Sequence, residues 1–355
     1  MINNYIRKDL AGFTPYEPEL GSYPIKLDAN ENPFVHNEGL LNKIKEFIMD
    51  SSNITRYPDT TSSLLKNKIA EYWQLKAENV VCGVGSDQII DCMLKVLIEP
   101  GDKIVFPSPS FSMYKHSTVL NHGVPIEITL NQDNDYNYDL DEFIQVANKE
   151  KPKAIFLCSP NNPTGNVLDN DSIEYVLKNV KCPVVLDEAY AEFADTTSVA
   201  LVNKYEHLVV LRTFSKAYGL AGLRVGYALG SKAMIDGIKL GMPPYNLNTI
   251  SQYVGTLIID QIDLYNKDIE FIINERKRLA SELQTINNVE KVYPSEANFL
   301  LIKTNKSTLA KELKEKGILV RNFSSHPNML NCIRVTIGTE EENNKLIEVL
   351  NTLLS

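Results

Sequence analysis

The stretch Arg212-Thr-Phe-Ser-Lys-Ala-Tyr-Gly-Leu-Ala-Gly-Leu-Arg224 combines a lysine, a hydroxyl side chain and two arginines among small residues. It follows an apolar run, Leu208–Leu211, that is typical of a buried strand. Lys216, just beyond this strand and among Ser, Ala and Gly, is poorly explained as a solvated surface residue. We interpret it as a Schiff-base lysine with phosphate-binding groups beside it. Many loop lysines have no such role, so this interpretation depends on partners elsewhere in the chain.

Short apolar runs alternate with helical patterns from residue 79 onward, which predicts an α/β domain. We expect a mostly parallel, seven-stranded sheet with helices on both faces, built from 79–82, 103–106, 125–130, 154–158, 184–186, 208–211 and 225–229. A helical pattern from Thr249 past Leu279 is expected to link this domain to a smaller α+β domain. The predicted division is an N-terminal segment (1–35) packed on the small domain or a partner subunit, a large cofactor-binding domain (36–260) and a small domain (261–355).

The composition excludes several classes of protein. A net charge of −9 over 355 residues argues against nucleic-acid binding, which needs a basic surface. No apolar run approaches the ~20 residues of a membrane span, and the polar start contains no signal-peptide core. Five cysteines without a Cys-x-x-Cys pair favour a reducing compartment, so we expect a cytoplasmic protein.

Ligands of open α/β sheets bind beyond the carboxyl ends of the strands, so the polar residues there are the candidates for a site. Gly85-Ser-Asp87 follows the first strand and opens a helix, which favours phosphate binding at its backbone N–H groups. The alternative is an ordinary helix start with Asp87 as the N-cap residue. The rigid loop Ser159-Pro-Asn-Asn-Pro-Thr-Gly165 can point fixed asparagine amides at a ligand oxygen.

Asp187-Glu-Ala-Tyr190 follows a further apolar strand, where an acid needs a cationic partner. A protonated pyridine nitrogen would be that partner, and Tyr190 would reach the ring hydroxyl. Together with Lys216, these groups describe one cofactor, pyridoxal 5'-phosphate. Asp187 would keep the ring nitrogen protonated, Tyr190 and Asn162 would hold the ring oxygen, and Lys216 would bind the cofactor and move the proton.

The remaining cofactor contacts come from other strand ends. We expect Ser215, Arg224 and the backbone amides at Ser86 and Asp87 to hold the phosphate. Phe111 follows a strand and is expected to lie against the ring, with a role as core filler as the alternative.

Over nearly its whole length the chain resembles the fold-type I aminotransferases, the aspartate-aminotransferase-like family. The resemblance rests on Ser159–Gly165, Asp187–Tyr190 and Thr213–Arg224. Three weaker motifs are similar to the histidinol-phosphate aminotransferases within that family: Thr14-Pro-Tyr16, Arg56-Tyr-Pro-Asp59 and Pro244-Tyr-Asn-Leu-Asn248. The resemblance implies the cofactor roles given above. It also implies a homodimer in which Tyr57 reaches the phosphate of the neighbouring subunit. Relatives often carry Tyr where this chain has Phe111, so the ring is kept and the hydroxyl is lost.

The resemblance implies that the substrate end accepts two amino donors in turn, expected to be histidinol phosphate and glutamate, with 2-oxoglutarate as the 2-oxo acid. Arg334, inside an apolar run, is the best candidate for their anionic groups, and Arg321 is the second. A structural ion pair is the alternative for Arg334 and a rim charge for Arg321. Tyr16, through the resemblance, and Asn30, in an Asn-rich turn, complete the predicted substrate site. The five histidines have no ligand spacing, and we expect no metal site.

Other functions on the same fold remain open at this point. One is an aromatic amino-acid aminotransferase, which would not require a substrate phosphate. Another is a phosphothreonine decarboxylase, which would release carbon dioxide without consuming 2-oxoglutarate. A non-enzymatic regulator would need a DNA-binding segment, for which the first 30 residues are too short and too broken.

Overall fold

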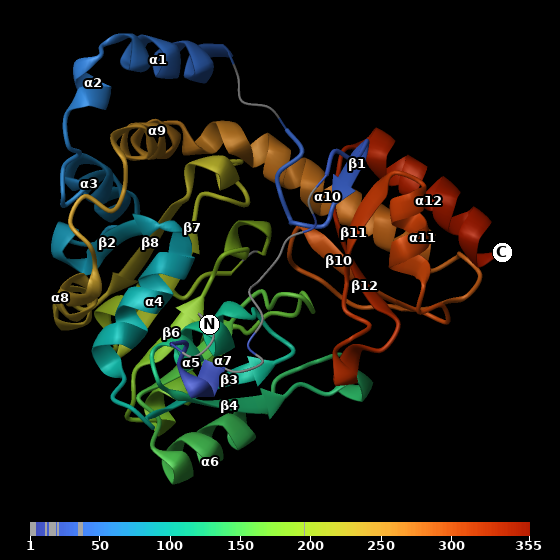
Figure 1. Ribbon diagram of the computed structural model, residues 1–355, viewed down its shortest axis with the longest axis horizontal. Coiled ribbons are helices and arrows are strands. Elements are labelled where there is room, and N and C mark those ends of the chain that lie inside the picture. Colours follow the sequence, from blue (N-terminus) through green and yellow to red (C-terminus); the bar gives the residue numbers. More distant parts are fainter. Residues whose placement is uncertain (1–4, 11–12, 14–18, 20, 35–37, 195) are drawn as a thin grey trace.

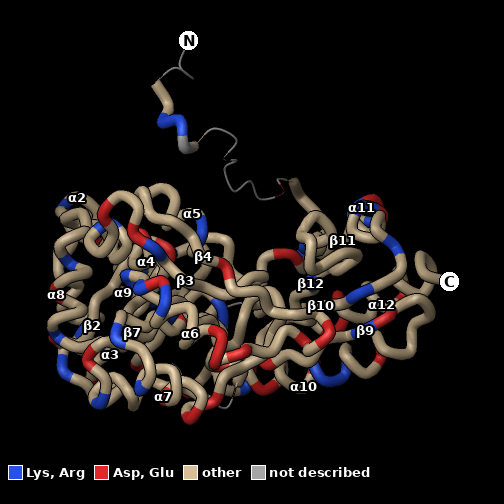
Figure 2. The backbone as a smooth tube through the Cα atoms, turned by 90° about the horizontal axis from the view of Figure 1, so that it is seen from below, with Lys and Arg blue, Asp and Glu red and all other residues tan. Residues whose placement is uncertain are grey.

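The computed structural model describes residues 5–10, 13, 19, 21–34, 38–194 and 196–355. Two lobes are visible in Figure 1, with the early and middle parts of the chain in the larger lobe and the C-terminal part in the smaller. Acidic and basic residues are interspersed along both lobes (Figure 2). None of the helices in the described ranges combines the length and the apolar character that crossing a bilayer requires.

The larger lobe contains a seven-stranded sheet. Its strands are β2 (Val80–Val84), β3 (Lys103–Ser108), β4 (Val124–Thr129), β5 (Ala154–Cys158), β6 (Val184–Asp187), β7 (Leu208–Thr213) and β8 (Val225–Gly230). Their order is β2-β8-β7-β6-β5-β3-β4, and only β8 runs antiparallel to its neighbours. The predicted α/β fold with a mostly parallel seven-stranded sheet is therefore confirmed.

Helices cover both faces of this sheet (Figure 1). Apolar side chains of α4 (Gly85–Leu97), α5 (Met113–Leu120) and α8 (Lys232–Gly241) pack on one face. The opposite face is covered by α3 (Ser63–Tyr72), α6 (Leu140–Glu150), α7 (Asn170–Asn179) and α9 (Thr249–Asp260). The central strands β5, β6 and β7 are buried along their whole length, because helices cover them on both sides. Two further helices, α1 (Glu38–Met49) and α2 (Ser52–Thr55), lie at the outer edge of this lobe (Figure 1).

The smaller lobe contains a five-stranded sheet in the order β1-β11-β12-β10-β9. Four strands come from the C-terminal part: β9 (Val289–Val292), β10 (Phe299–Thr304), β11 (Ile318–Asn322) and β12 (Cys332–Thr336). The fifth is β1 (Ile25–Leu27), which pairs in parallel with β11. Helices α10 (Asn266–Leu283), α11 (Leu309–Glu315) and α12 (Glu340–Leu354) complete this lobe. The exact boundaries at residues 35/36 and 260/261 stay a prediction.

The long helix expected from residue 249 onward is interrupted. Helix α9 ends at Asp260, a 3-10 turn spans Ile262–Tyr265, and α10 begins at Asn266. The interruption brings Tyr265 into the core, where its ring packs edge-on against Tyr218 with centroids 5.6 Å apart. Burial of this aromatic side chain accompanies the loss of the regular helix, which the apolar periodicity alone did not reveal.

Candidate active site

A cavity of about 470 Å³ lies where the carboxyl ends of the parallel strands meet the smaller sheet. Because β3, β5, β6 and β7 run in the same direction, the residues that follow them reach the same edge of the sheet. This cavity brings together most of the side chains predicted from the sequence. They are Asn30, Ser86, Asp87, Phe111, Asn162, Asp187, Tyr190, Ser215, Lys216, Arg224, Arg321 and Arg334.

Lys216 lies three residues beyond the end of β7. Its Nζ donates a hydrogen bond to the carbonyl oxygen of Ala29 (2.9 Å) and lies 5.6 Å from the centroid of the Tyr190 ring. Burial, reinforced by the positive charge of Arg334, lowers the pKa of this amine to about 8. A lowered pKa suits an amine that must act as nucleophile and proton carrier, because less free energy is needed to remove its proton.

Asp187 is the last residue of β6 and is 2% exposed. Its Oδ2 accepts a hydrogen bond from Tyr114 Oη (2.7 Å), and its Oδ1 accepts one from the backbone N–H of Ala189 (3.1 Å). Burial raises the pKa of this carboxyl to about 6, although the Tyr114 hydrogen bond opposes the rise. Both partners are neutral, so a cationic ring nitrogen in the cavity would supply the charge that stabilises the carboxylate. The surroundings of Asp187 therefore fit the protonated ring nitrogen of pyridoxal phosphate.

Tyr114 is a functional residue that the sequence did not reveal. It lies in α5 three residues after Phe111 and is fully buried, with its ring stacked on Phe156 at 4.7 Å. An aromatic residue in an amphipathic helix resembles any other core residue in the sequence. Its place in the helix that directly follows the Phe111 loop was the one available signal.

Tyr190 follows β6 and points its hydroxyl into the cavity wall. Oη accepts a hydrogen bond from Asn30 Nδ2 (3.0 Å), and the ring packs edge-on against Phe299 at 5.2 Å. Burial raises the pKa of this phenol, so the hydroxyl keeps its proton at neutral pH. Asn162 lies on the same side of the cavity, and its Oδ1 accepts a hydrogen bond from Arg334 Nη1.

The turn from β2 into α4 forms another wall of the cavity. Gly85 has φ +74°, and a Cβ placed there would lie 2.5 Å from Arg224 Nη2. Arg224 Nη1 lies 3.4 Å from Ser215 Oγ, while Nη2 is paired with Asp87 Oδ2 at 3.0 Å. The backbone of Gly226 approaches this turn so closely that a Cβ would lie 2.4 Å from Ser86 N. Small residues thus bring a guanidinium, a hydroxyl and a helix N-terminus together, which is the donor set that a phosphate requires.

Asp87 does not cap α4, contrary to one sequence expectation. The helix begins at Gly85, two residues before Asp87, and the N-cap residue is Val84. The left-handed conformation of Gly85 lets the chain turn from strand to helix without a polar cap, and the Asp87 carboxylate is left to pair with Arg224.

Arg321 and Arg334 face each other on neighbouring strands. They are directly paired in the register of β11 and β12, so their side chains project from the same face of the sheet. Arg334 is 6% exposed and lies between the rings of Phe299 (5.3 Å) and Phe323 (5.8 Å). Its Nη2 donates to the carbonyl oxygen of Asp28. Two adjacent guanidinium groups in one cavity make a site for an anion.

Three predicted residues do not line this cavity, and the first is Gly85, which lies beside Arg224 in the turn that precedes Ser86. Tyr16 lies outside the described residues. Tyr57 is 81% exposed, and its ring stacks on Tyr245 with centroids 4.4 Å apart. It is not among the residues that line the cavity within this chain.

Arg212, which the sequence left without a role, is buried beside the site. Its Nη1 pairs with Glu188 Oε2 (2.7 Å) and its Nη2 with Glu192 Oε1 (2.8 Å). The guanidinium also lies 4.9 Å from the ring of Trp73. Glu188 follows Asp187 directly, so this ion pair connects the ends of β6 and β7.

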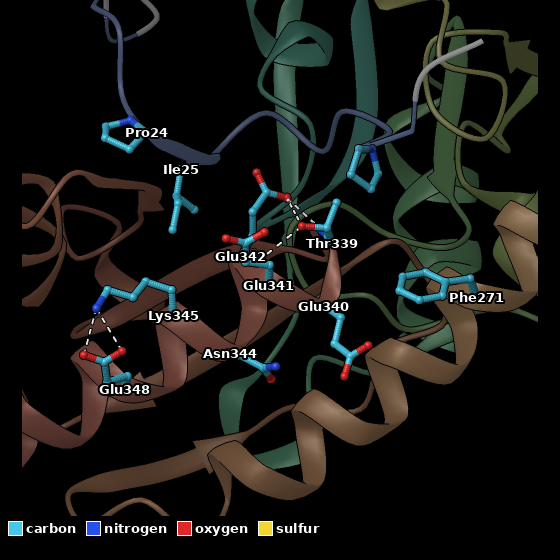
Figure 3. Close-up of a pocket in the computed structure, with 11 residues that line it drawn as sticks. Pro24, Ile25, Phe271, Thr339, Glu340, Glu341, Glu342, Asn344, Lys345 and Glu348 are labelled. Carbon is cyan, nitrogen blue, oxygen red and sulfur yellow. Dashed lines mark hydrogen bonds and ion pairs between the residues drawn. The ribbon is translucent and has the colours of Figure 1, made fainter. Parts of the chain in front are cut away.

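A larger and more open pocket of about 1160 Å³ lies beside the start of α12 (Figure 3). Three of its charged side chains have partners within the chain: the Glu342 carboxylate accepts from the backbone N–H of Thr339, and Lys345 pairs with Glu348. The Thr339–Glu342 contacts form a capping box for α12. The acidic residues here are explained by the helix start. No group of metal-ligating side chains occurs in the described part of the chain.

Comparisons with known proteins agree with this geometry. The family model "Aminotransferase class I and II" matches residues 23–350. A histidinol-phosphate aminotransferase of Ruminiclostridium cellulolyticum is 44% identical over 352 residues, which cover 99% of this chain and 98% of that protein. Another, from Caldanaerobacter subterraneus subsp. tengcongensis, is 40% identical over the full length of both chains.

Solved structures show the same fold. The histidinol-phosphate aminotransferase of Clostridium acetobutylicum superimposes with a TM-score of 0.85 at 25% identity, covering 93% of this chain and 98% of that one. The resemblance predicted from the motifs is confirmed over the whole length. The chain belongs to the class I and II aminotransferase family.

Proposed function

We propose that the protein transfers the amino group of L-histidinol phosphate to 2-oxoglutarate, giving imidazole-acetol phosphate and L-glutamate, in histidine biosynthesis. The full-length relatives that are 40 to 44% identical carry the name of this activity. The structural observation that carries the proposal is the single cavity shared by Lys216, Asp187 and the arginine pair Arg321 and Arg334.

The cofactor is pyridoxal 5'-phosphate, which supplies a ring that accepts the electron pair of the carbon that loses its proton. Asp187 would hold a proton on the ring nitrogen, while Tyr190 and Asn162 would bind the ring oxygen. Phe111 would lie against the ring. The phosphate would be held by the group that surrounds the β2–α4 turn: Gly85, Ser86, Asp87, Ser215 and Arg224.

Lys216 has two tasks in this proposal. Its Nζ would hold the cofactor covalently, and as a free amine it would move the proton at the reacting carbon of the substrate. A pKa of about 8 supports both tasks, because the amine can lose and regain a proton near neutral pH. The carbonyl of Ala29, which accepts from Nζ, supports its orientation.

The arginine pair is proposed to bind the anionic group of each substrate in turn. Histidinol phosphate carries a phosphate, and glutamate and 2-oxoglutarate carry carboxylates. Arg334 is buried and held by Asn162 and Asp28, so its direction is fixed before substrate arrives. Tyr16 belongs to the same proposal through the family motif alone.

A homodimer with Tyr57 at the neighbouring cofactor phosphate is part of the proposal. Tyr57 and Tyr245 form an exposed aromatic pair, and α1 and α2 add exposed apolar side chains: Leu41, Met49 and Ile54. Apolar side chains gathered in this way are typical of protein interfaces. We place the enzyme in the cytoplasm, a location supported by the five cysteines, all of them free.

A half-reaction screen tests the activity directly. Purified protein should show a cofactor absorbance band that borohydride changes irreversibly, and histidinol phosphate should discharge this band without 2-oxoglutarate. Faster discharge by phenylalanine would favour an aromatic amino-acid aminotransferase instead.

Release of carbon dioxide from phosphothreonine would favour a decarboxylase. The L-threonine-O-3-phosphate decarboxylase of Porphyromonas gingivalis has the same fold at 21% identity, with a TM-score of 0.80. The fold therefore does not separate the two reactions, and the assay must.

A further inference from the structure

Asn30 occupies a constrained position at the edge of the active-site cavity. It follows β1, is 1% exposed and has φ +54°, a left-handed conformation that asparagine adopts more readily than most residues. Its backbone N–H donates to Thr336 Oγ1 (2.9 Å), and its carbonyl oxygen accepts from Asn298 Nδ2 (3.1 Å). Side chains of the smaller lobe therefore hold the backbone of this residue.

The side-chain amide of Asn30 is bonded at both ends. Oδ1 lies on the side of Thr336 and accepts from its hydroxyl at 3.2 Å. Nδ2 then faces Tyr190 Oη at 3.0 Å and donates to it. A tyrosine hydroxyl has a single proton, and an NH₂ group cannot accept it. The Tyr190 proton must point to a different acceptor.

We propose that Asn30 is a positioning residue for Tyr190: its amide occupies an acceptor site of Oη and leaves the hydroxyl proton to be donated to the ring oxygen of the cofactor. This inference rests on the proposed function, because it requires pyridoxal phosphate at Lys216. It gives Asn30 a role different from the substrate contact expected from the sequence, since both ends of the amide are already bonded within the protein.

The surroundings of Tyr190 favour a hydroxyl that donates. The charged and titratable groups that act on it are Arg334, Cys158, Asp187 and Lys216. Burial outweighs the attraction of Arg334 and raises the pKa of the phenol, so the proton is retained. A hydrogen bond received from Asn30 polarises the O–H group and makes it a stronger donor.

The expected consequence is spectroscopic. With the cofactor bound, a donor on its ring oxygen would withdraw negative charge from that oxygen. The Lys216 nitrogen beside it would then lose its proton at lower pH. Loss of the Asn30 hydrogen bond should therefore raise the midpoint of the absorbance change with pH, by about half to one pH unit.

Asn30→Gly is the informative variant, because glycine adopts the left-handed conformation without strain and carries no amide. The matched control is Asn331→Gly, at another left-handed asparagine (φ +60°) that does not line the cavity. Absorbance spectra of both loaded variants and the wild type are recorded from about pH 6 to about pH 9, around the ordinary pKa values of the groups involved. We expect a raised midpoint in Asn30→Gly alone.

Two further variants separate positioning from a structural role. Asn30→Asp keeps the size of the side chain but replaces the donor by an acceptor, so the Tyr190 proton should turn away from the cofactor and the midpoint should rise further. In a Tyr190→Phe background, Asn30→Gly should have no additional effect. If Asn30→Gly does not retain the cofactor, Thr336→Val, which removes the hydroxyl that orients the amide, should raise the midpoint by a smaller amount.

An unshifted midpoint in the loaded Asn30→Gly variant, or a shift that persists in the Tyr190→Phe background, would overturn the role of Asn30. Either result would leave the proposed function unaffected. The absence in the wild type of a band that borohydride changes would overturn the proposed cofactor site, and the inference with it.

Discussion

Asp187→Asn should stabilise the protein when the cofactor has been removed. The carboxyl of Asp187 is buried at the end of β6, and its two hydrogen-bond donors, Tyr114 and Ala189, are both neutral. An asparagine has the same shape and can accept from the Ala189 N–H while donating to Tyr114 Oη. The substitution removes a buried charge, keeps the hydrogen bond from Ala189 and reverses the direction of the one with Tyr114.

The magnitude follows from the pKa. Burial raises the pKa of Asp187 from 3.8 to about 6, which corresponds to about 3 kcal/mol. The folded protein binds this proton more tightly than the unfolded chain, so stability falls as pH rises from about 4 to about 6 and stays low above that range. At pH 7.5 the apoprotein of the variant should be about 2 to 3 kcal/mol more stable than the wild type, and the difference should shrink toward pH 5.5.

Urea unfolding of the apoproteins, followed by fluorescence, measures this difference. The chain contains one tryptophan, Trp73, which packs against the buried guanidinium of Arg212 and so reports on unfolding of the larger lobe. Cofactor added afterward should stabilise the wild type more than the variant, because only the wild type offers a negative charge to the ring nitrogen.

Asp59→Asn is a control that is expected to change the stability in the opposite direction. The Asp59 carboxylate accepts hydrogen bonds from Ser63 and Thr61, and these lower its pKa well below the ordinary value. This variant should lose stability at neutral pH. An Asp187→Asn apoprotein less stable than the wild type at pH 7.5 would refute the reasoning, since the buried carboxylate would then be a net stabilising group.

Three other substitutions test the site and its support. Lys216→Ala should abolish turnover measured with histidinol phosphate and 2-oxoglutarate, because the covalent link and the proton carrier are both lost; appreciable turnover would contradict this role. Arg334→Ala should raise the KM for both substrates by about 10- to 100-fold, from the loss of a charge-assisted hydrogen bond, and an effect on one substrate alone would exclude a shared anion site. Arg212→Met should lower the free energy of unfolding by about 3 to 5 kcal/mol, because Glu188 and Glu192 remain buried without their cation; a loss below about 1 kcal/mol in urea titrations would show that water reaches these carboxylates.

The sequence predicted the larger sheet well because its strands are strong local signals. The runs that form β5, β6 and β7 are continuous, apolar and bounded by turn residues, as expected for strands covered on both faces. Parallel direction then places the residues after each strand at one edge. For this reason Lys216, Asp187 and Asn162, far apart in the chain, could be assigned to one site before the fold was known.

Contacts that depend on distant pairing could not be predicted. The hydrogen bond between Asn30 and Tyr190 joins residues 160 positions apart and depends on a strand of three residues, β1. The sequence indicates a short strand at Lys26, but three residues have too little pattern to show which strand they pair with. Tyr114 was missed for a different reason: its ring is typical of a core residue, and only the position of its hydroxyl next to Asp187 shows the polar role.

The pairing of β1 with β11 determines when the active site can form during synthesis of the chain. Residues 25–27 leave the ribosome long before their partner in the sheet, 318–322, has been made. The residues that hold Asn30, Asn298 and Thr336, are also made later than Asn30. The larger sheet can assemble while synthesis continues, but the wall of the cavity that carries Ala29 and Asn30 cannot close until Thr336 is available. Chains that stop before Thr336 therefore lack a complete site.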